Sequence, residues 1–222
     1  MAVSENMIEL LLFLAGGAYL VILTALVVGL LRSVAADVKD PSPRPFVSVL
    51  IPARDEEATI RACLESVRDQ TYPRDRYEVI LIDDHSQDGT ARIAQELAPS
   101  FPHLRVVVPQ ESTHLTGRSN ALAHGIDVAR GEIFLMTDAD CVIPPTWVEG
   151  TAARFMPGVG VVGGLTVQRS NGALEGMQSL DWTFLLGIAA ATVGLRLPLS
   201  IIGNNFSIHR KAYDDVGGFR SI

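Results

Sequence analysis

The chain has 222 residues, of which 48% are hydrophobic, and a net charge of −7. This charge leaves no basic surface of the kind that binds nucleic acid, so we expect no nucleic-acid partner. Two cysteines, Cys63 and Cys141, are too few for a disulfide framework or a cysteine zinc site. The length allows one large domain plus an appendage.

Residues 10–31 contain no charged side chain. As a helix they would measure about 33 Å, against about 30 Å for the hydrocarbon core of a bilayer. We therefore predict a transmembrane helix over residues 8–32. A cleaved signal peptide, ending near residues 34–36, is the alternative. Against it, the apolar stretch is long, and Glu5 and Glu9 rather than basic residues precede it.

Basic residues follow this helix, at Arg32, Lys39 and Arg44, and none precedes it. The positive-inside rule then predicts a single-pass protein of the cell membrane with the rest of the chain in the cytoplasm. Residues 33–45 include prolines that fix their own φ and restrict the residue before them. We predict an extended, proline-rich linker there.

Beyond the linker, short apolar runs alternate with segments of helical spacing. This alternation predicts an α/β domain over residues 46–222, with a mostly parallel sheet covered by helices on both faces. The predicted strands are residues 46–51, 77–82, 104–108, 133–137, 159–167 and 204–209. The predicted helices are residues 57–70, 90–97, 119–129, 184–195 and a short one ending at residue 216. For residues 184–195 we favour a buried or membrane-interface helix over a second transmembrane pass, because the stretch is short.

Polar clusters follow three of these strands, at residues 52–55, 83–86 and 138–140. The carboxyl ends of parallel strands lie at one edge of the sheet, where open α/β folds bind ligands. The last cluster, Asp138-Ala139-Asp140, is a DxD motif. Two adjacent carboxylates favour a positive partner, and Mg²⁺ or Mn²⁺ held together with a phosphate-bearing ligand would supply it. Taken alone, the motif is also compatible with a solvated turn.

These segments together resemble the membrane-associated branch of the family 2 inverting glycosyltransferases, which have the nucleotide-sugar-binding GT-A fold. The matching motifs, in family order, are residues 47–57, 79–90, 117–122, 137–141, 203–206 and 217–219. The resemblance implies a metal-dependent transfer of a sugar from a nucleotide diphosphate sugar, which we expect to be a UDP-sugar, with inversion. The implied acceptor is a lipid, a lipid-linked glycan or a polysaccharide.

The resemblance also implies roles for single residues. Asp84 would bond the base edge, Asp138 would lie near the ribose and the metal, and Asp140 would be the metal ligand proper. Arg118 would reach a phosphate oxygen, or else be a solvated charge at a helix start. The full set of implied donor-binding residues is Pro52, Ala53, Arg54, Asp55, Asp84, Arg118 and Asp138, and the implied metal ligands are Asp138 and Asp140.

In such enzymes the general base is a carboxylate in a Glu-Asp pair that follows the turn matched here by residues 217–219. This chain ends at Ile222, before any such pair. We therefore assign no catalytic residue within it and interpret it as a C-terminally truncated enzyme. The alternative is an inactive, membrane-tethered fragment that binds a nucleotide sugar or a partner. A dinucleotide dehydrogenase is disfavoured, because no G-x-G-x-x-G motif follows the first strand.

Overall fold

The computed structural model describes residues 5–34, 44–112, 114–170 and 172–221. The chain divides into two compact units, one holding α1 and α6 and the other holding the sheet with the remaining helices. Most of the predicted linker, residues 35–43, lies outside the described residues. Residues 35 and 36 of the possible signal-peptide cleavage site lie outside them as well. The predicted division at residues 8–32, 33–45 and 46–222 stays a prediction.

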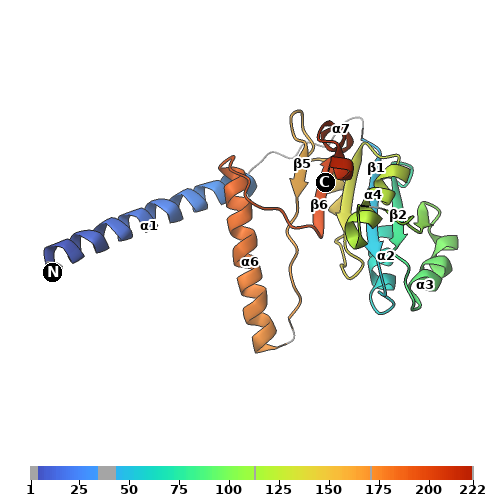
Figure 1. Ribbon diagram of the computed structural model, residues 1–222, viewed down its shortest axis with the longest axis horizontal. Coiled ribbons are helices and arrows are strands. Elements are labelled where there is room, and N and C mark those ends of the chain that lie inside the picture. Colours follow the sequence, from blue (N-terminus) through green and yellow to red (C-terminus); the bar gives the residue numbers. More distant parts are fainter. Residues whose placement is uncertain (1–4, 35–43, 113, 171, 222) are drawn as a thin grey trace. The chain divides into compact units, whose positions relative to one another are not determined.

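The described strands are β1 Val47–Ala53, β2 Tyr77–Asp83, β3 Leu104–Val107, β4 Ile133–Thr137, β5 Val161–Gly163 and β6 Asn205–His209. The described α-helices are α1 Glu5–Val34, α2 Ile60–Arg68, α3 Thr90–Leu97, α4 Gly117–Val128, α5 Trp147–Ala152, α6 Ala173–Gly194 and α7 Arg210–Asp215. Short 3₁₀ turns follow α3 at Ala98–Ser100 and α7 at Gly218–Ser221. Figure 1 labels most of these elements.

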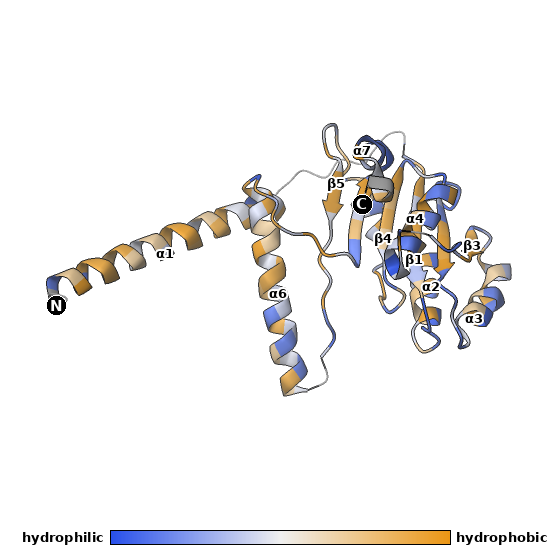
Figure 2. Cartoon of the chain, viewed as in Figure 1, coloured by the Kyte–Doolittle hydropathy of each residue, from blue (hydrophilic) through white to orange (hydrophobic). Residues whose placement is uncertain are grey.

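The helix α1 is the predicted apolar helix, extended by a few residues at each end. Its stretch Asn6–Val34 is long and apolar enough to cross a membrane, with a mean hydropathy of 2.5, and its most apolar 18-residue window is not buried at all. Figure 2 shows hydrophobic residues along most of its length. Among the described helices, no other combines this length with this composition.

The helix α6 begins at Ala173, well before the predicted start at residue 184. Its first half carries Glu175, Gln178 and Asp181 among leucines, so the continuous apolar run starts only later. The prediction used that run and missed the amphipathic turns before it. With 22 residues, α6 is long enough to span a membrane, but its composition is not apolar enough to do so.

The six-stranded sheet has the order β3-β2-β1-β4-β6-β5. The pairs β1–β2, β1–β4 and β2–β3 are parallel, whereas β6 runs antiparallel to both β4 and β5. The predicted α/β class with a mostly parallel sheet is therefore confirmed. Parallel strands need a crossover connection between them, and α2, α3 and α4 supply these in the first four strands.

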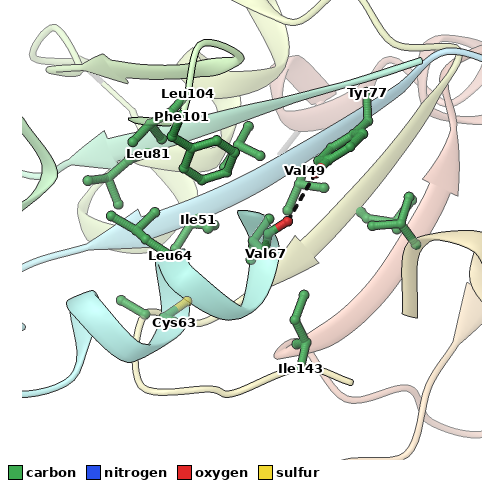
Figure 3. Packing of buried hydrophobic residues seen from close by; sticks show 14 of the residues in the cluster. Val49, Ile51, Cys63, Leu64, Val67, Tyr77, Leu81, Phe101, Leu104 and Ile143 are labelled. Carbon is green, nitrogen blue, oxygen red and sulfur yellow. Dashed lines mark hydrogen bonds between the residues drawn. The ribbon is translucent and has the colours of Figure 1, made fainter. Parts of the chain in front are cut away.

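Apolar clusters lie on both faces of this sheet, as the continuous apolar strands predicted. One cluster joins the sheet to α2, α3 and α5, and the other joins it to α4 and α7. Figure 3 shows α2 placing Cys63, Leu64 and Val67 against the strands. There the hydroxyl of Tyr77 donates to the carbonyl of Val67 at 3.2 Å, which satisfies a phenol that is only 1% exposed.

Two further predicted boundaries are wrong for identifiable reasons. The helix α2 begins at Ile60 rather than residue 57, because the residues before it are hydrogen-bonded into the site described below. The strand β5 covers three residues rather than 159–167. Beyond it, a Cβ on Gly164 would collide with the side chain of Asn205, so the glycine permits the close approach of that side chain. The short helix α5 was not predicted.

A buried carboxylate, Glu78, is the second residue of the mostly apolar strand β2. Its side chain is 0% exposed and pairs with Arg130 at 3.0 Å and Arg105 at 3.3 Å. The Ser48 hydroxyl donates to it at 2.8 Å and in turn accepts from Gly131 N at 2.8 Å. A buried charge is tolerated when it is paired and hydrogen-bonded in this way.

We predict that Glu78→Ala lowers the free energy of unfolding by about 3 kcal/mol, because it leaves buried donors without an acceptor. The measurement is urea unfolding of the detergent-solubilised chain, followed by tryptophan fluorescence. The control is Glu96→Ala, which removes a carboxylate that also pairs with two arginines, Arg61 and Arg92, but at the surface. We expect a much smaller effect there, and equal losses in the two variants would contradict the buried-network interpretation.

Candidate active site

The predicted polar clusters meet at one edge of the sheet. In the parallel register Pro52 pairs with Ile82 and Ala53 with Asp83, while Leu50 of β1 pairs with Met136 of β4. The loops that follow β1, β2 and β4 therefore leave the sheet at the same edge. Pro52 is half-buried, and Ala53 is 4% exposed and forms part of the floor of this edge.

The loops after β1 and β2 are hydrogen-bonded to each other, and we call these bonds, between residues 55–57 and 86–90, the loop clasp. Asp55 donates its backbone N–H to Ser86 Oγ at 3.0 Å, and its Oδ1 accepts from Gln87 N at 2.6 Å. The backbone of Asp55 has a φ of 56°, a left-handed conformation that costs free energy in a residue with a side chain. The hydrogen bonds around Asp55 hold it in this conformation. A direct contact of Asp55 with a donor molecule stays a prediction.

A second pair of bonds completes the loop clasp. Glu57 N donates to Asp88 Oδ2 and Gly89 N donates to Glu57 Oε2, both at 2.9 Å. Asp88 also accepts from the backbone N–H and hydroxyl of Thr90, the first residue of α3, and these bonds lower the pKa of Asp88. Asp88 thus satisfies the first backbone N–H of α3, from the position before the N-cap residue Gly89.

Arg54 and Asp84 face each other across the ends of β1 and β2. The guanidinium Nη1 of Arg54 lies 3.7 Å from Asp84 Oδ2, and the arginine side chain is 64% exposed while the carboxylate is 14% exposed. The backbone N–H of Asp84 donates to the Ala53 carbonyl at 2.8 Å. The structure therefore brings three of the predicted donor-binding residues, Ala53, Arg54 and Asp84, into one group.

The DxD motif forms a tight turn after β4. Cys141 N donates to the Asp138 carbonyl at 3.2 Å, and the Ala139 side chain, at 2% exposure, is packed into the apolar cluster. The buried alanine leaves the flanking carboxylates outside the cluster, with Asp138 half-buried and Asp140 exposed.

Both cysteines are free thiols next to this turn. Cys63 donates to the Asp138 carbonyl at 3.6 Å, and burial raises the pKa of Cys63 to about 12. Burial, followed by the charge of Asp140, also raises the pKa of Cys141. Both shifts favour the protonated form of the thiol.

Arg118 is anchored on the DxD motif. Its Nη2 lies 2.6 Å and its Nε 3.1 Å from Asp138 Oδ1, and Nη2 also donates to the Gly203 carbonyl at 2.9 Å. The helix α4 carries Arg118 in its first turn, and β6 follows directly after Gly203. One guanidinium thus joins three segments that are distant in sequence. The sequence had left two roles open for Arg118, a phosphate contact or a solvated charge at a helix start.

Asp138 and Asp140 offer hard oxygen atoms to a divalent cation. Both bonds from Arg118 to Asp138 use Oδ1, so Oδ2 is not engaged by this arginine. Within the described residues no group of three or more histidine, cysteine, aspartate or glutamate side chains is arranged to hold a metal by itself. Mg²⁺ is typically held by one or two carboxylates plus substrate phosphates, so a two-carboxylate site fits a cation that arrives with a diphosphate.

Asn205 and Trp147 form a support behind the motif that the sequence did not reveal as a pair. Trp147 Nε1 donates to Asn205 Oδ1 at 3.0 Å, and Asn205 Nδ2 donates to the Leu165 carbonyl at 3.3 Å. Asn205 pairs with Thr137, the residue before Asp138, across β4 and β6. The matched motif at residues 203–206 was a signal for this support, but its tryptophan partner is remote in sequence.

A large cavity of about 790 Å³ lies elsewhere in the same unit, beside α4 and α7. Its lining includes His124, Asp127, Arg210 and Tyr213 and contains none of the predicted donor-binding or metal-binding residues. We assign the site to the sheet edge, because the charged side chains and the close backbone approaches converge there.

The sequence of this chain is similar to those of known glycosyltransferases. The model of glycosyl transferase family 2 matches residues 48–217. Glycosyltransferase AglE of Haloferax volcanii is 38% identical over 124 residues, which are 55% of this chain and 40% of that protein. The beta-monoglucosyldiacylglycerol synthase of Trichormus variabilis is 31% identical over 184 residues, which are 79% of this chain and 38% of that protein. The chain thus spans about two fifths of the length of these relatives.

Among solved structures, the mannosyltransferase PcManGT from Pyrobaculum calidifontis, in complex with GDP-Man and Mn²⁺, superposes with a TM-score of 0.65. It is 26% identical, and the match covers 88% of this chain and 55% of that one. The α/β fold with its mostly parallel sheet is that of the GT-A glycosyltransferases. On the family match over residues 48–217, this chain belongs to glycosyltransferase family 2.

Proposed function

We propose that this chain carries the donor-binding part of a membrane-anchored glycosyltransferase that takes a sugar from a UDP-sugar and transfers it with inversion. The proposed acceptor is a lipid, a lipid-linked glycan or a polysaccharide, and the proposed location is the cytoplasmic face of the cell membrane. The observation that carries this proposal is the convergence of Asp84, Asp138, Asp140 and Arg118 on one edge of the sheet.

The nucleotide would bind over the ends of β1 and β2. A carboxylate at Asp84 can accept a hydrogen bond from a ring N–H of the base, and uracil offers one such N–H on its pairing edge. Pro52 and Ala53 would line the base and ribose, with Arg54 moving aside from Asp84 or remaining beside it. The loop clasp supports this proposal, because loops already held by hydrogen bonds lose little freedom on binding.

The diphosphate would lie between Asp138, Asp140 and Arg118. Mg²⁺ or Mn²⁺ on the two carboxylates would neutralise charge on the departing nucleotide diphosphate. Arg118 presents a planar set of donors that suits a phosphate oxygen as well as a carboxylate. We propose that Arg118 is held by Asp138 in the absence of donor and turns to a phosphate oxygen when donor and cation bind.

The acceptor proposal rests on α1 and on the relatives. A helix able to cross the bilayer would tether the sheet domain to the membrane, and one relative is named for a synthase of a glucosylated diacylglycerol. Inversion needs a general base for the acceptor hydroxyl. We assign that role to no residue of this chain.

We predict that Asp140→Asn weakens UDP binding in Mn²⁺ by more than about tenfold, because a neutral amide is a poor ligand for a hard cation. Isothermal titration with UDP is the measurement, since UDP binding needs neither an acceptor nor a base. Asp75→Asn is the control, because this exposed carboxylate precedes β2 at the opposite edge of the sheet. Equal UDP affinities of the unsubstituted chain in Mn²⁺ and in chelator would contradict the metal assignment, and tighter binding of GDP than of UDP would contradict the uridine assignment.

Arg118→Gln should have opposite effects on two equilibria. Binding of UDP with Mn²⁺ should weaken about tenfold, because a charge-assisted hydrogen bond to phosphate is lost. Binding of Mn²⁺ alone, measured by electron paramagnetic resonance, should become tighter, because the cation no longer competes with the guanidinium for Asp138. Arg118→Lys, which keeps the charge but not the planar donors, should fall between. Parallel losses in both equilibria would instead indicate that Arg118 only maintains the local structure.

A further inference from the structure

One face of α6 exposes a row of large apolar side chains. Leu174, Met177, Leu180 and Phe184 are between 64% and 72% exposed. Their spacing of three, three and four residues places them on one side of a helix. Exposed apolar patches of this kind mark surfaces that contact a protein or a lipid.

The opposite side of α6 packs against its own unit. Ser179 Oγ donates to the Gln168 carbonyl at 3.1 Å, and Leu186 is only 7% exposed. The helix therefore has one side that contacts the protein and one apolar side that does not. Asp181, four residues after Met177 and three before Phe184, lies within the apolar side and is exposed. This side therefore suits a shallow layer with water nearby and not the bilayer centre, where a carboxylate is costly.

The C-terminal end of α6 is fixed to the C-terminal part of α1. A Cβ on Gly194 would collide with the Gly29 carbonyl, and a Cβ on Gly29 would collide with the Ala191 carbonyl. Ala191 and Thr192 are buried at this crossing. Paired small residues allow two helix backbones to approach this closely, so the position of α6 is tied to that of α1.

The direction of α6 then decides which partner its apolar side meets. Gly29 lies near the end of α1 that carries Arg32, and Arg196 lies two residues after the end of α6. These cations suit the level of the lipid headgroups. In Figure 1 α6 runs crosswise to α1 from this end. If α1 crosses the bilayer, a helix crosswise to it at the headgroup level lies along the membrane surface.

We propose that α6 is an in-plane helix of the membrane–water interface, on the same leaflet as the C-terminal end of α1. Its apolar side, Leu174, Met177, Leu180 and Phe184, enters the outer part of the acyl chains, and the partner of this surface is the lipid bilayer. The proposal rests on the membrane anchor of the proposed function. It adds a second, lateral contact with the bilayer, supplied by residues between β5 and β6.

The test uses the full chain in vesicles of phosphatidylcholine and phosphatidylglycerol. Single cysteines replace Phe184, Gln178 or Leu20 in a Cys141→Ser background, and each carries an environment-sensitive fluorophore. Cys63 is buried, with a pKa raised to about 12, and is not labelled in the folded chain. Gln178 is the matched control, because it is exposed on α6 away from the apolar side. Quenching is measured with nitroxide lipids labelled near the headgroup or near the chain end.

We expect the label at Phe184→Cys to be quenched most by the shallow nitroxide, the label at Leu20→Cys most by the deep one, and the label at Gln178→Cys by neither. A quenched Leu20→Cys with an unquenched Phe184→Cys would overturn the in-plane helix and leave the anchor standing. A blue-shifted but unquenched label at Phe184→Cys would overturn it in favour of a protein partner, such as a second copy of the chain. Strongest quenching there by the deep nitroxide would overturn it in favour of a spanning helix.

An unquenched label at Leu20→Cys would overturn both the anchor and the in-plane helix. Nucleotide binding by the same preparations, measured with UDP and Mn²⁺, tests the proposed donor site separately. If the chain binds UDP but fails the depth test, only the proposal of an interfacial helix is overturned. If it passes the depth test but does not bind UDP, only the proposed donor site is overturned.

Discussion

The parallel pairing of β1 with β2 and with β4 is the constraint on which the site depends. It brings the ends of three strands to one edge, although their residues are up to 87 positions apart, from Arg54 to Cys141. Several carboxylates therefore gather in a small volume, where like charges repel one another. The structure compensates them with Arg54 on Asp84 and Arg118 on Asp138.

This compensation explains how the proposed donor site can be held together before a donor binds. The loop clasp uses Asp55 and Glu57 as hydrogen-bond acceptors for backbone N–H groups, which keeps both loops in place without a ligand. In the proposed complex a divalent cation would carry positive charge beside the carboxylates, as the two arginines do in the absence of donor. The site then exchanges one set of ionic partners for another and does not have to form new loops on binding.

Much of this arrangement could be predicted from the sequence. Apolar runs that end in polar clusters predicted the strands of the parallel sheet and the edge that collects Asp84, Asp138 and Asp140, because strand period and parallel topology are local and general rules. Glu78 could not be recognised as a buried charge, since its partners Arg105 and Arg130 lie 27 and 52 residues away. The true length of α6 was also missed. In its first half the apolar residues recur at helical spacing between polar ones and do not form a continuous apolar run.

The sequence by itself determined the class of fold, the apolar first helix, the DxD motif and the family motifs, because each is written in contiguous residues. Only the tertiary structure decided that Arg118 rests on Asp138 and Gly203, that Asp55 serves the loop clasp, and that α6 is joined to α1 through Gly29 and Gly194. For each of these contacts the sequence leaves several partners possible. The packing of the whole chain decides which segments come close enough to interact, and no single segment carries that information.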